Sequence, residues 1–184
     1  MKTNLLNTRA KATVYAEVLL GAARVRNNVF DVAGQLDQLV AAVRGSIELR
    51  KALIDKTIPA AAKKGIVAEI FSSFAPELLT TFDVMVDRGD LSLLPRVRDT
   101  YVALAEKALG AAFVDVTTVV PLDETLREQI VTKYSAQLGR KVMLREYVDP
   151  GLIGGIVLSA HGKRIDASVS SQLESARHVL SKTV

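Results

Sequence analysis

The sequence predicts an α+β protein, with an N-terminal six-helix bundle in residues 1–110 and a small β-α-β-β-β-α domain in residues 111–184. Up to Gly110, apolar residues recur at every third or fourth position, which is the spacing of amphipathic helices. Beyond Gly110, a run of β-branched residues and a series of glycine turns indicate strands. Apolar residues make up 49% of the chain but aromatic residues only 5%, so the core must be mainly aliphatic.

Capping residues and prolines mark most of the expected helix starts in the first 110 residues. Ser46 has the side chain of a good N-cap, and Pro59, Pro76 and Pro95 suit a first helical turn, which needs no amide proton. The expected helices begin near residues 8, 29, 46, 59, 76 and 92. The short connections between them favour antiparallel packing in a bundle.

The first helix, expected from Thr8 to about Arg26, carries two stripes. The apolar stripe consists of Val14, Val18, Ala22 and Val25, with Leu19 beside it. The second stripe consists of small residues, Ala12, Ala16 and Ala23. Small residues allow another helix to approach closely, and the simplest interpretation is packing within the bundle.

Four strands and two helices are expected in the C-terminal domain. Phe113–Val120 should form the first strand, and a helix capped by Asp123 should follow and end at Gly139. The apolar face of that helix consists of Leu126, Ile130, Tyr134 and Leu138. The other strands are expected at residues 142–148, 153–158 and 164–166. Ser168 should cap a last helix whose inward face consists of Val169, Leu173, Ala176 and Leu180.

Composition argues against several classes of protein. The chain has no cysteine and only two histidines, so it lacks disulfides and thiolate zinc sites, and a multi-histidine metal site is not expected. The net charge of +4 is spread over both halves, whereas nucleic-acid-binding proteins usually concentrate basic residues on one face. No apolar run approaches the roughly 18 residues that span a bilayer, and no signal-peptide core is present. We therefore expect a soluble, unprocessed chain that meets a membrane only indirectly.

Two catalytic interpretations of the C-terminal domain have weak support. Asp149, His161 and Asp166 would suit an acid–base cluster in a small hydrolase, but the first acid lies in a turn and the second precedes a helix, where acids are favoured structurally. Gly162-Lys163 does not begin a phosphate-binding loop, because Arg164 and a strand follow the lysine. We expect no catalytic residue, cofactor or metal.

An RNA-binding protein is the alternative prediction. Gly151–Gly154 has the GxxG spacing of a KH domain, whose loop clamps a nucleic-acid backbone. The two residues between these glycines, Leu152 and Ile153, have no side-chain donor for a phosphate. The apolar interior of the loop favours packing instead.

The segment from Arg140 to Leu180 resembles the signature region of the delta subunit of F-type ATP synthases, the oligomycin-sensitivity-conferring protein family. The matching elements are Lys141-Val142, Val148–Gly155, Gly162, Ile165–Val169 and Leu173, and the opening helix of the family has a Tyr-Ala pair like Tyr15-Ala16. The family's Gly-Arg-Leu and Leu-Pro elements correspond to Gly89-Asp90-Leu91 and Leu94-Pro95. Two departures remove positive charge: Asp90 replaces the usual arginine, and Ser170–Gln172 replaces an arginine-rich helix start.

The resemblance implies a non-catalytic peripheral-stalk subunit that links the catalytic head to the b subunits and resists torque, without a cofactor. Its N-terminal bundle would bind an N-terminal helix of an alpha subunit between its first and fifth helices, and its C-terminal domain would bind the C-terminal end of b. The residues implied for the alpha subunit are Tyr15, Ala16, Leu19, Leu79, Phe82 and Val86, and those for b are Leu173, Ala176 and Leu180. The structural motif consists of Asp149, Pro150, Gly154, Gly155, Gly162, Asp166 and Ser168. The expected location is peripheral, at the cytoplasmic face of a bacterial plasma membrane.

Overall fold

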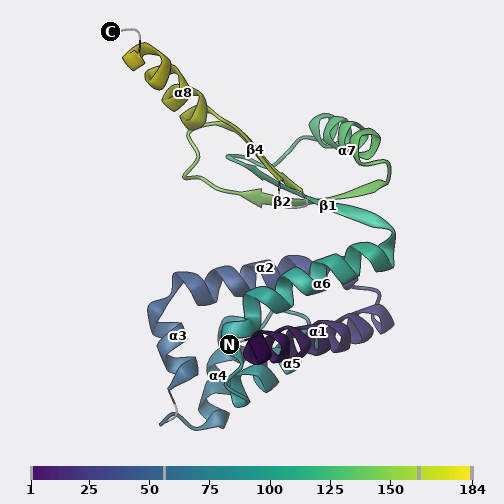
Figure 1. Cartoon of the computed structure of the whole chain (residues 1–184), viewed down its shortest axis with the longest axis vertical. Coiled ribbons are helices and arrows are strands. Elements are labelled where there is room, and N and C mark those ends of the chain that lie inside the picture. Colours follow the sequence, from purple (N-terminus) through teal and green to yellow (C-terminus); the bar gives the residue numbers. More distant parts are fainter. Residues whose placement is uncertain (1, 56, 161–162, 183–184) are drawn as a thin grey trace. The chain divides into compact units, whose positions relative to one another are not determined.

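The computed structural model describes residues 2–55, 57–160 and 163–182, and the chain divides into two compact units, residues 1–107 and 108–184. The division lies close to Gly110, where the sequence pattern changes. Among the described residues there are eight α-helices and one four-stranded sheet (Figure 1). The fold class is therefore α+β, as the sequence predicts.

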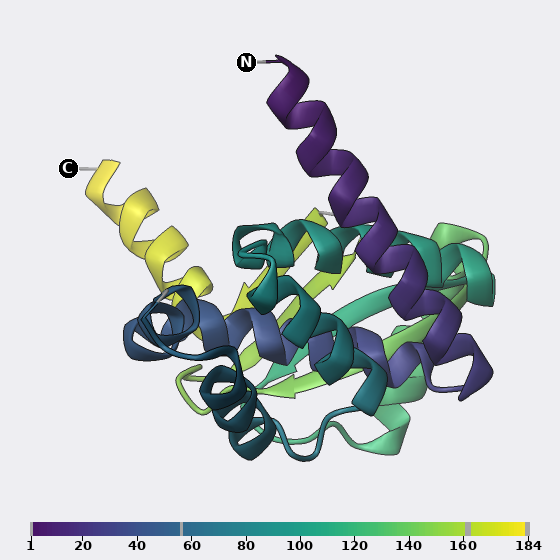
Figure 2. The same cartoon turned by 90° about the horizontal axis from the view of Figure 1, so that it is seen from below.

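The regular secondary structure in the described part of the first unit is helical. The first helix begins at Lys2, six residues before the expected start, and Pro59 is the N-cap of the fourth helix, not its first helical residue. The elements are α1 (Lys2–Val25), α2 (Val29–Gly45), α3 (Ile47–Ile54), α4 (Ala60–Ile70), α5 (Pro76–Asp87), the short 3-10 helix η1 (Leu91–Leu93) and α6 (Leu94–Leu109). Ser46 caps α3, because its Oγ accepts a hydrogen bond from the Leu49 amide at 3.1 Å. Pro76 occupies the first turn of α5. Figures 1 and 2 show α1 along the outside of this helical unit.

The small stripe of α1, not its valine stripe, faces the core of the first unit. Ala16 is 0% exposed, and Ala12 and Ala23 are buried with it, whereas Val18 is 62% exposed. Helix α1 packs against α5 and α2, and alanine allows the helix axes to approach closely. The alanines are thus buried within the first unit, against neighbouring helices. The valines on the opposite side remain in contact with solvent.

The second unit has the predicted order β-α-β-β-β-α. Its elements are β1 (Ala111–Thr118), α7 (Glu124–Leu138), β2 (Lys141–Val148), β3 (Gly155–Ala160), β4 (Lys163–Ser168) and α8 (Val169–Lys182). The strands lie in the order β2-β1-β3-β4, with β1 parallel to β2 and antiparallel to β3, which is antiparallel to β4. Strand β3 begins two residues later than expected, at Gly155. His161 and Gly162, expected at the tip of the β3–β4 turn, lie outside the described residues.

One face of the sheet and helix α7 enclose the apolar core of the second unit. Its members are Ala112, Val114, Val116, Leu122, Ile130, Tyr134 and Val142. Leu126, predicted on the same helical face, is largely exposed in the first turn of α7. The alternation along β1 places Asp115 on the other face, where its Oδ1 accepts a hydrogen bond from the Arg145 side chain at 2.6 Å. Asp115 and Arg145 are direct neighbours in the parallel register, which explains how a buried guanidinium is tolerated.

Gly155 begins β3 with a backbone conformation that other residues rarely adopt. Its φ is +86°, and a Cβ at this position would lie 2.4 Å from the Ala167 carbonyl oxygen and 2.8 Å from the Ser168 Cα, both backbone atoms. The close approach of β4 therefore requires glycine here. This local geometry explains the paired glycines of the signature region.

We expect a Gly155→Ala substitution to lower the free energy of unfolding of the second unit by about 3 kcal/mol, because it combines left-handed strain with a backbone clash. Urea denaturation followed by circular dichroism measures this loss. Gly21→Ala is the matched control, since nothing lies within 4 Å of a Cβ there and alanine favours the interior of α1. Equal stability of the two variants would show that β4 does not constrain Gly155.

Candidate partner-binding surfaces

The structure places most residues implied for alpha-subunit binding inside the first unit. Tyr15, Ala16 and Leu19 of α1 and Phe82 and Val86 of α5 are all buried, and Leu79 is half-buried. These side chains form part of the packing between helices of the unit. A partner could touch the five buried ones only if α1 and α5 moved apart. Binding through them stays a prediction.

Helices α1 and α5 are antiparallel and linked at both ends of their contact. Beyond the end of α1, the Arg26 Nε lies 3.5 Å from the Glu77 Oε2 in the first turn of α5. Nearer the start of α1, the Tyr15 hydroxyl donates a hydrogen bond to the Asp90 Oδ2 after α5, at 3.0 Å. Figure 1 shows the two helices side by side. These two contacts join the helices on either side of the outer surface between them.

Exposed valines of both helices lie between these two links. Val18 is three residues from Tyr15 and Val84 seven residues from Glu77, so each valine lies on the helix face that makes a link. Val84 is 37% exposed, and Ala22, one turn after Val18, is half-buried. We call Val18, Ala22 and Val84 the α1–α5 surface. These three side chains are apolar, and exposed Arg88, one turn beyond Val84, borders them.

Asp90 explains one departure from the family pattern. Its Oδ1 accepts a hydrogen bond from the Lys11 ammonium at 2.9 Å, and its Oδ2 accepts the bond from Tyr15. Burial alone would raise the pKa of Asp90, but the hydrogen bonds from Lys11 and Tyr15, with the charges of Lys11 and Arg88, hold it below its usual value. The position that is usually an arginine can thus be a carboxylate in this chain, because Lys11 of α1 supplies the positive charge that pairs with it.

An Asp90→Asn substitution is expected to cost about 1 kcal/mol of unfolding free energy at pH 7, since it removes an ion pair and weakens the bond to Tyr15. Because the pKa of Asp90 is lowered by folding, its stabilisation is complete above the unfolded pKa of about 3.9 and is lost as the pH falls through the folded pKa. The difference between the two proteins should therefore shrink below about pH 4. Urea unfolding at several pH values measures it, and Glu17→Gln on the exposed side of α1 is the control. A pH-independent difference would contradict the ion pair.

Helix α8 exposes the apolar face that the sequence predicts to be inward. Leu173 is 59% exposed, and Val169 and Ala176 are exposed as well, so the predicted inward orientation is wrong for the described side chains. The backbone of Leu180 continues the same helix, but its side chain lies outside the described part of the structure. Helix α8 continues from the end of β4 and extends away from the sheet (Figure 1), so Leu173 and Ala176 are exposed, whereas Val169 at its start lies close to Gly154. We call Val169, Leu173 and Ala176 the α8 surface.

Local hydrogen bonds account for the polar residues of the structural motif. After β2, the Asp149 Oδ1 accepts the Gly151 amide at 2.9 Å and forms the turn that contains Pro150. Before α8, the Asp166 Oδ1 accepts the Ser168 amide at 3.0 Å, and the Ser168 Oγ accepts the Ser171 amide at 3.3 Å as an N-cap. A Cβ on Gly154 would press on Val169 at 3.1 Å. These residues shape the turns that precede β3 and α8.

The hydrolase hypothesis requires two acids that the fold keeps apart. Asp149 follows β2 and Asp166 lies on β4, at opposite edges of the four-stranded sheet. Three strand spacings separate those edges, or about 14 Å. Hydrogen bonds from the hydroxyl and amide of Ser168 lower the pKa of Asp166, as expected of a helix-capping acid. The geometry therefore does not form an acid–base pair.

Metal and membrane sites were sought in the described parts of the chain. Residues 2–55, 57–160 and 163–182 contain no cluster of three His, Cys, Asp or Glu side chains suited to a metal ion. Within the same ranges, none of the helices combines the length and apolar character that crossing a bilayer requires.

Comparison with known proteins identifies the family. A sequence model described as "ATP synthase delta (OSCP) subunit" matches residues 12–180. The chain is 30% identical over 179 residues to ATP synthase subunit delta of Geotalea uraniireducens, with 96% of this chain and 99% of that protein covered. It is 33% identical over 172 residues to the protein of the same name from Prochlorococcus marinus strain AS9601, with 92% and 96% covered.

A solved structure shares the fold. A chain in the cryo-EM structure of the Toxoplasma gondii mitochondrial ATP synthase hexamer aligns with a TM-score of 0.53 and 20% identity, covering 92% of this chain and 96% of that chain. This similarity and the sequence matches agree along nearly the whole length. The chain belongs to the ATP synthase delta (OSCP) family and is a non-catalytic subunit of the enzyme's peripheral stalk.

Proposed function

We propose that this chain links the catalytic head of ATP synthase to the b subunits, with its first unit bound to an N-terminal helix of an alpha subunit and its second unit bound to the C-terminal end of b. The observation that carries the proposal is that each unit leaves one apolar helix face uncovered. Members of the family are stalk subunits, so helices of neighbouring subunits are the natural occupants of such faces. Uncovered apolar helix faces are a common mark of binding surfaces.

The α1–α5 surface suits an amphipathic guest helix. Helix-in-groove recognition uses a guest whose apolar side chains repeat every three or four residues and pack between two host helices. Val18 and Val84 supply apolar contacts from each host helix, and Ala22 leaves room for a larger guest side chain. The links at Glu77 and Asp90 join the host helices on either side of this surface, so we expect binding to require little rearrangement.

The α8 surface suits the end of the b stalk in the same way. Val169, Leu173 and Ala176 are spaced four and three residues apart, so they form one stripe along α8. Ile165, half-exposed on the edge strand β4, extends the apolar area towards the sheet. A helix laid along this stripe would bury side chains that the unit itself leaves in water.

Binding to two different subunits by two separate units gives the stalk its mechanical role. Force that rotation exerts on the head would pass from the alpha helix through unit 1, along the chain, and into b. No chemical step is needed, in keeping with the family's structural function. The chain would lie at the cytoplasmic face of a bacterial plasma membrane and meet that membrane only through the complex.

The direct test is calorimetric titration of the full chain with a synthetic peptide that carries the N-terminal helix of an alpha subunit from the same source. We expect saturable one-to-one binding with a Kd in the micromolar range or tighter. Absence of binding at high micromolar peptide would overturn the assignment of unit 1. Salt-dependent binding of single-stranded RNA by the same protein would instead favour the RNA-binding alternative, which no observation here supports.

A further inference from the structure

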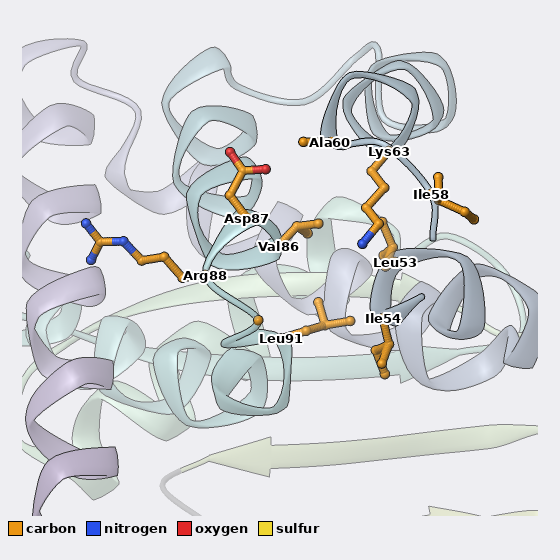
Figure 3. A pocket seen from close by; sticks show the side chains of 10 residues that line it. Leu53, Ile54, Ile58, Ala60, Lys63, Val86, Asp87, Arg88 and Leu91 are labelled. Carbon is orange, nitrogen blue, oxygen red and sulfur yellow. The ribbon is translucent and has the colours of Figure 1, made fainter. Parts of the chain in front are cut away.

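A pocket of about 540 Å³ lies in the first unit, apart from the α1–α5 surface. Its walls come from the end of α3, the following loop, the start of α4 and the segment that joins α5 to η1 (Figure 3). Most of the lining is aliphatic, and the chief contributors are Leu53, Ile54, Ile58, Val86 and Leu91. The volume lies within the range of about 300 to 1,000 Å³ that is typical of small-molecule sites.

The Lys63 side chain is largely buried in the wall of this apolar pocket, and its ammonium faces the open space. It is only 9% exposed, and Figure 3 shows its ammonium extending from α4 towards Leu53. Within the described residues, the ammonium makes no hydrogen bond and no ion pair. An ammonium at the wall of an apolar pocket with no bonded partner can form a charge-assisted hydrogen bond with an anionic ligand, so its position favours such a ligand.

The start of α4 adds to this positive potential. Its N-cap, Pro59, provides no side-chain cap, and its first turn has no acidic residue. The first amides of the helix, beginning at Ala60 in the pocket wall, therefore present the positive end of the helix dipole. Lys63 and the helix start thus act on the same side of the pocket.

Nearby charged groups are largely engaged elsewhere. The Asp87 carboxylate pairs with the Lys64 ammonium at 3.0 Å, and the Asp55 Oδ1 accepts the amide and the hydroxyl of Thr57 at 2.8 and 2.7 Å. Asp55 therefore acts on Lys63 only through charge. Figure 3 shows Arg88 extending away from Lys63. Among the described residues, Lys63 is therefore the cation that faces the apolar part of the pocket.

We propose that this pocket binds a small amphiphile with a single carboxylate, such as a medium-chain fatty acid. The carboxylate would lie at Lys63 and the first amides of α4, and the alkyl chain would lie among Leu53, Ile58 and Leu91. A protein helix is too large an occupant, because 540 Å³ equals roughly 7 Å of a cylinder about 10 Å wide, little more than one turn. A single carboxylate matches the one charge of the Lys63 ammonium.

The test is calorimetric titration of the full chain with octanoate at pH 7 and low salt. We expect saturable one-to-one binding, with an affinity that increases about fourfold for each methylene from hexanoate to octanoate as more chain is buried. Octan-1-ol, which has the chain without the charge, and octyl phosphate should each bind more weakly than octanoate. Acetate, which has the charge without the chain, should not bind measurably.

Lys63→Met retains the length of the side chain and removes its charge. It should weaken octanoate roughly tenfold or more and leave the affinity for octan-1-ol unchanged. Lys51→Met, on the exposed side of α3, is the matched control and should change neither affinity. Because the Lys63 ammonium makes no hydrogen bond or ion pair within the described residues, the Lys63 variant should unfold at the same or a higher urea concentration than the wild type.

Failure of the wild type to bind octanoate saturably, or equal binding by the Lys63 variant, would overturn the proposal. Nuclear Overhauser contacts in the wild type locate the ligand without any substitution. Contacts between octanoate methylenes and the methyl groups of Leu53 and Ile58 support the pocket. Contacts confined to methyl groups elsewhere would refute it, and octyl phosphate binding more tightly than octanoate would refute the single-carboxylate assignment.

Discussion

A Val18→Asp substitution is expected to weaken binding of an alpha-subunit N-terminal helix by roughly 30-fold or more, while the stability of the chain remains within about 0.5 kcal/mol of the wild type. Val18 lies at the centre of the α1–α5 surface and is 62% exposed in the free protein. The carboxylate is therefore hydrated before binding and would lose its water beneath an apolar guest helix. Peptide titration and urea denaturation give the two quantities separately.

Two further variants sharpen this result. Val120→Asp makes the same chemical change at an exposed position of the second unit, and it should leave the peptide affinity unchanged. Ala16→Asp should instead unfold the first unit, because Ala16 is fully buried against neighbouring helices and its carboxylate would have no partner. If Ala16→Asp proved stable and Val18→Asp bound normally, the partner would use the buried residues and the α1–α5 surface would be the wrong site.

A Leu173→Asp substitution is expected to reduce the affinity for a peptide from the C-terminal end of b by roughly 30-fold or more, because Leu173 is the largest described apolar side chain of the α8 surface. Its exposure in the free chain predicts little change in the unfolding free energy. Titration with the b peptide measures the first effect, and thermal unfolding the second.

Ser175→Asp is the matched control for this helix. Ser175 is exposed on a different side of α8, so an aspartate there should leave binding of b intact. The Leu173 variant should also keep full affinity for the alpha peptide, since the other unit binds it. Normal binding of b by the Leu173 variant would show that b contacts another part of the second unit.

The features that sequence predicts best here are those that depend on local backbone geometry. The turn at Asp149, the N-caps at Ser46 and Ser168, and the helix end at Gly139 each involve residues within a few positions of one another. Such residues impose the same geometry whatever the rest of the fold does. The order of elements in the second unit was predictable for the same reason.

The inward face of a helix was less predictable. In α1 the more hydrophobic stripe, which includes Val14 and Val18, is exposed, whereas the less hydrophobic alanines are buried. In α8 the apolar face is exposed throughout its described part. Hydrophobic periodicity indicates that one face of a helix becomes buried, but it does not show whether the same chain or another subunit buries it. In a subunit of a larger complex, we expect some apolar faces to be buried by neighbouring subunits.

Contacts between distant segments gave no sequence signal. Most of the Lys63 side chain is buried because the ends of α3 and α5 lie next to the first turn of α4. The residues adjacent to Lys63 in the sequence do not predict this burial. The pair of Arg145 and Asp115 depends on the parallel register of β1 and β2, which is known only once the strands are aligned. Both features require the tertiary fold.

The measurement that tests the central claim most directly is a titration with both partner peptides in sequence. The full chain is first saturated with the alpha-subunit N-terminal helix, and the peptide from the C-terminal end of b is then added to the complex. We predict that b binds with the same Kd as to the free chain and forms a three-component complex, because separate units hold the two helices. Displacement of the first peptide by the second, or failure of either to bind, would contradict a protein that joins two subunits.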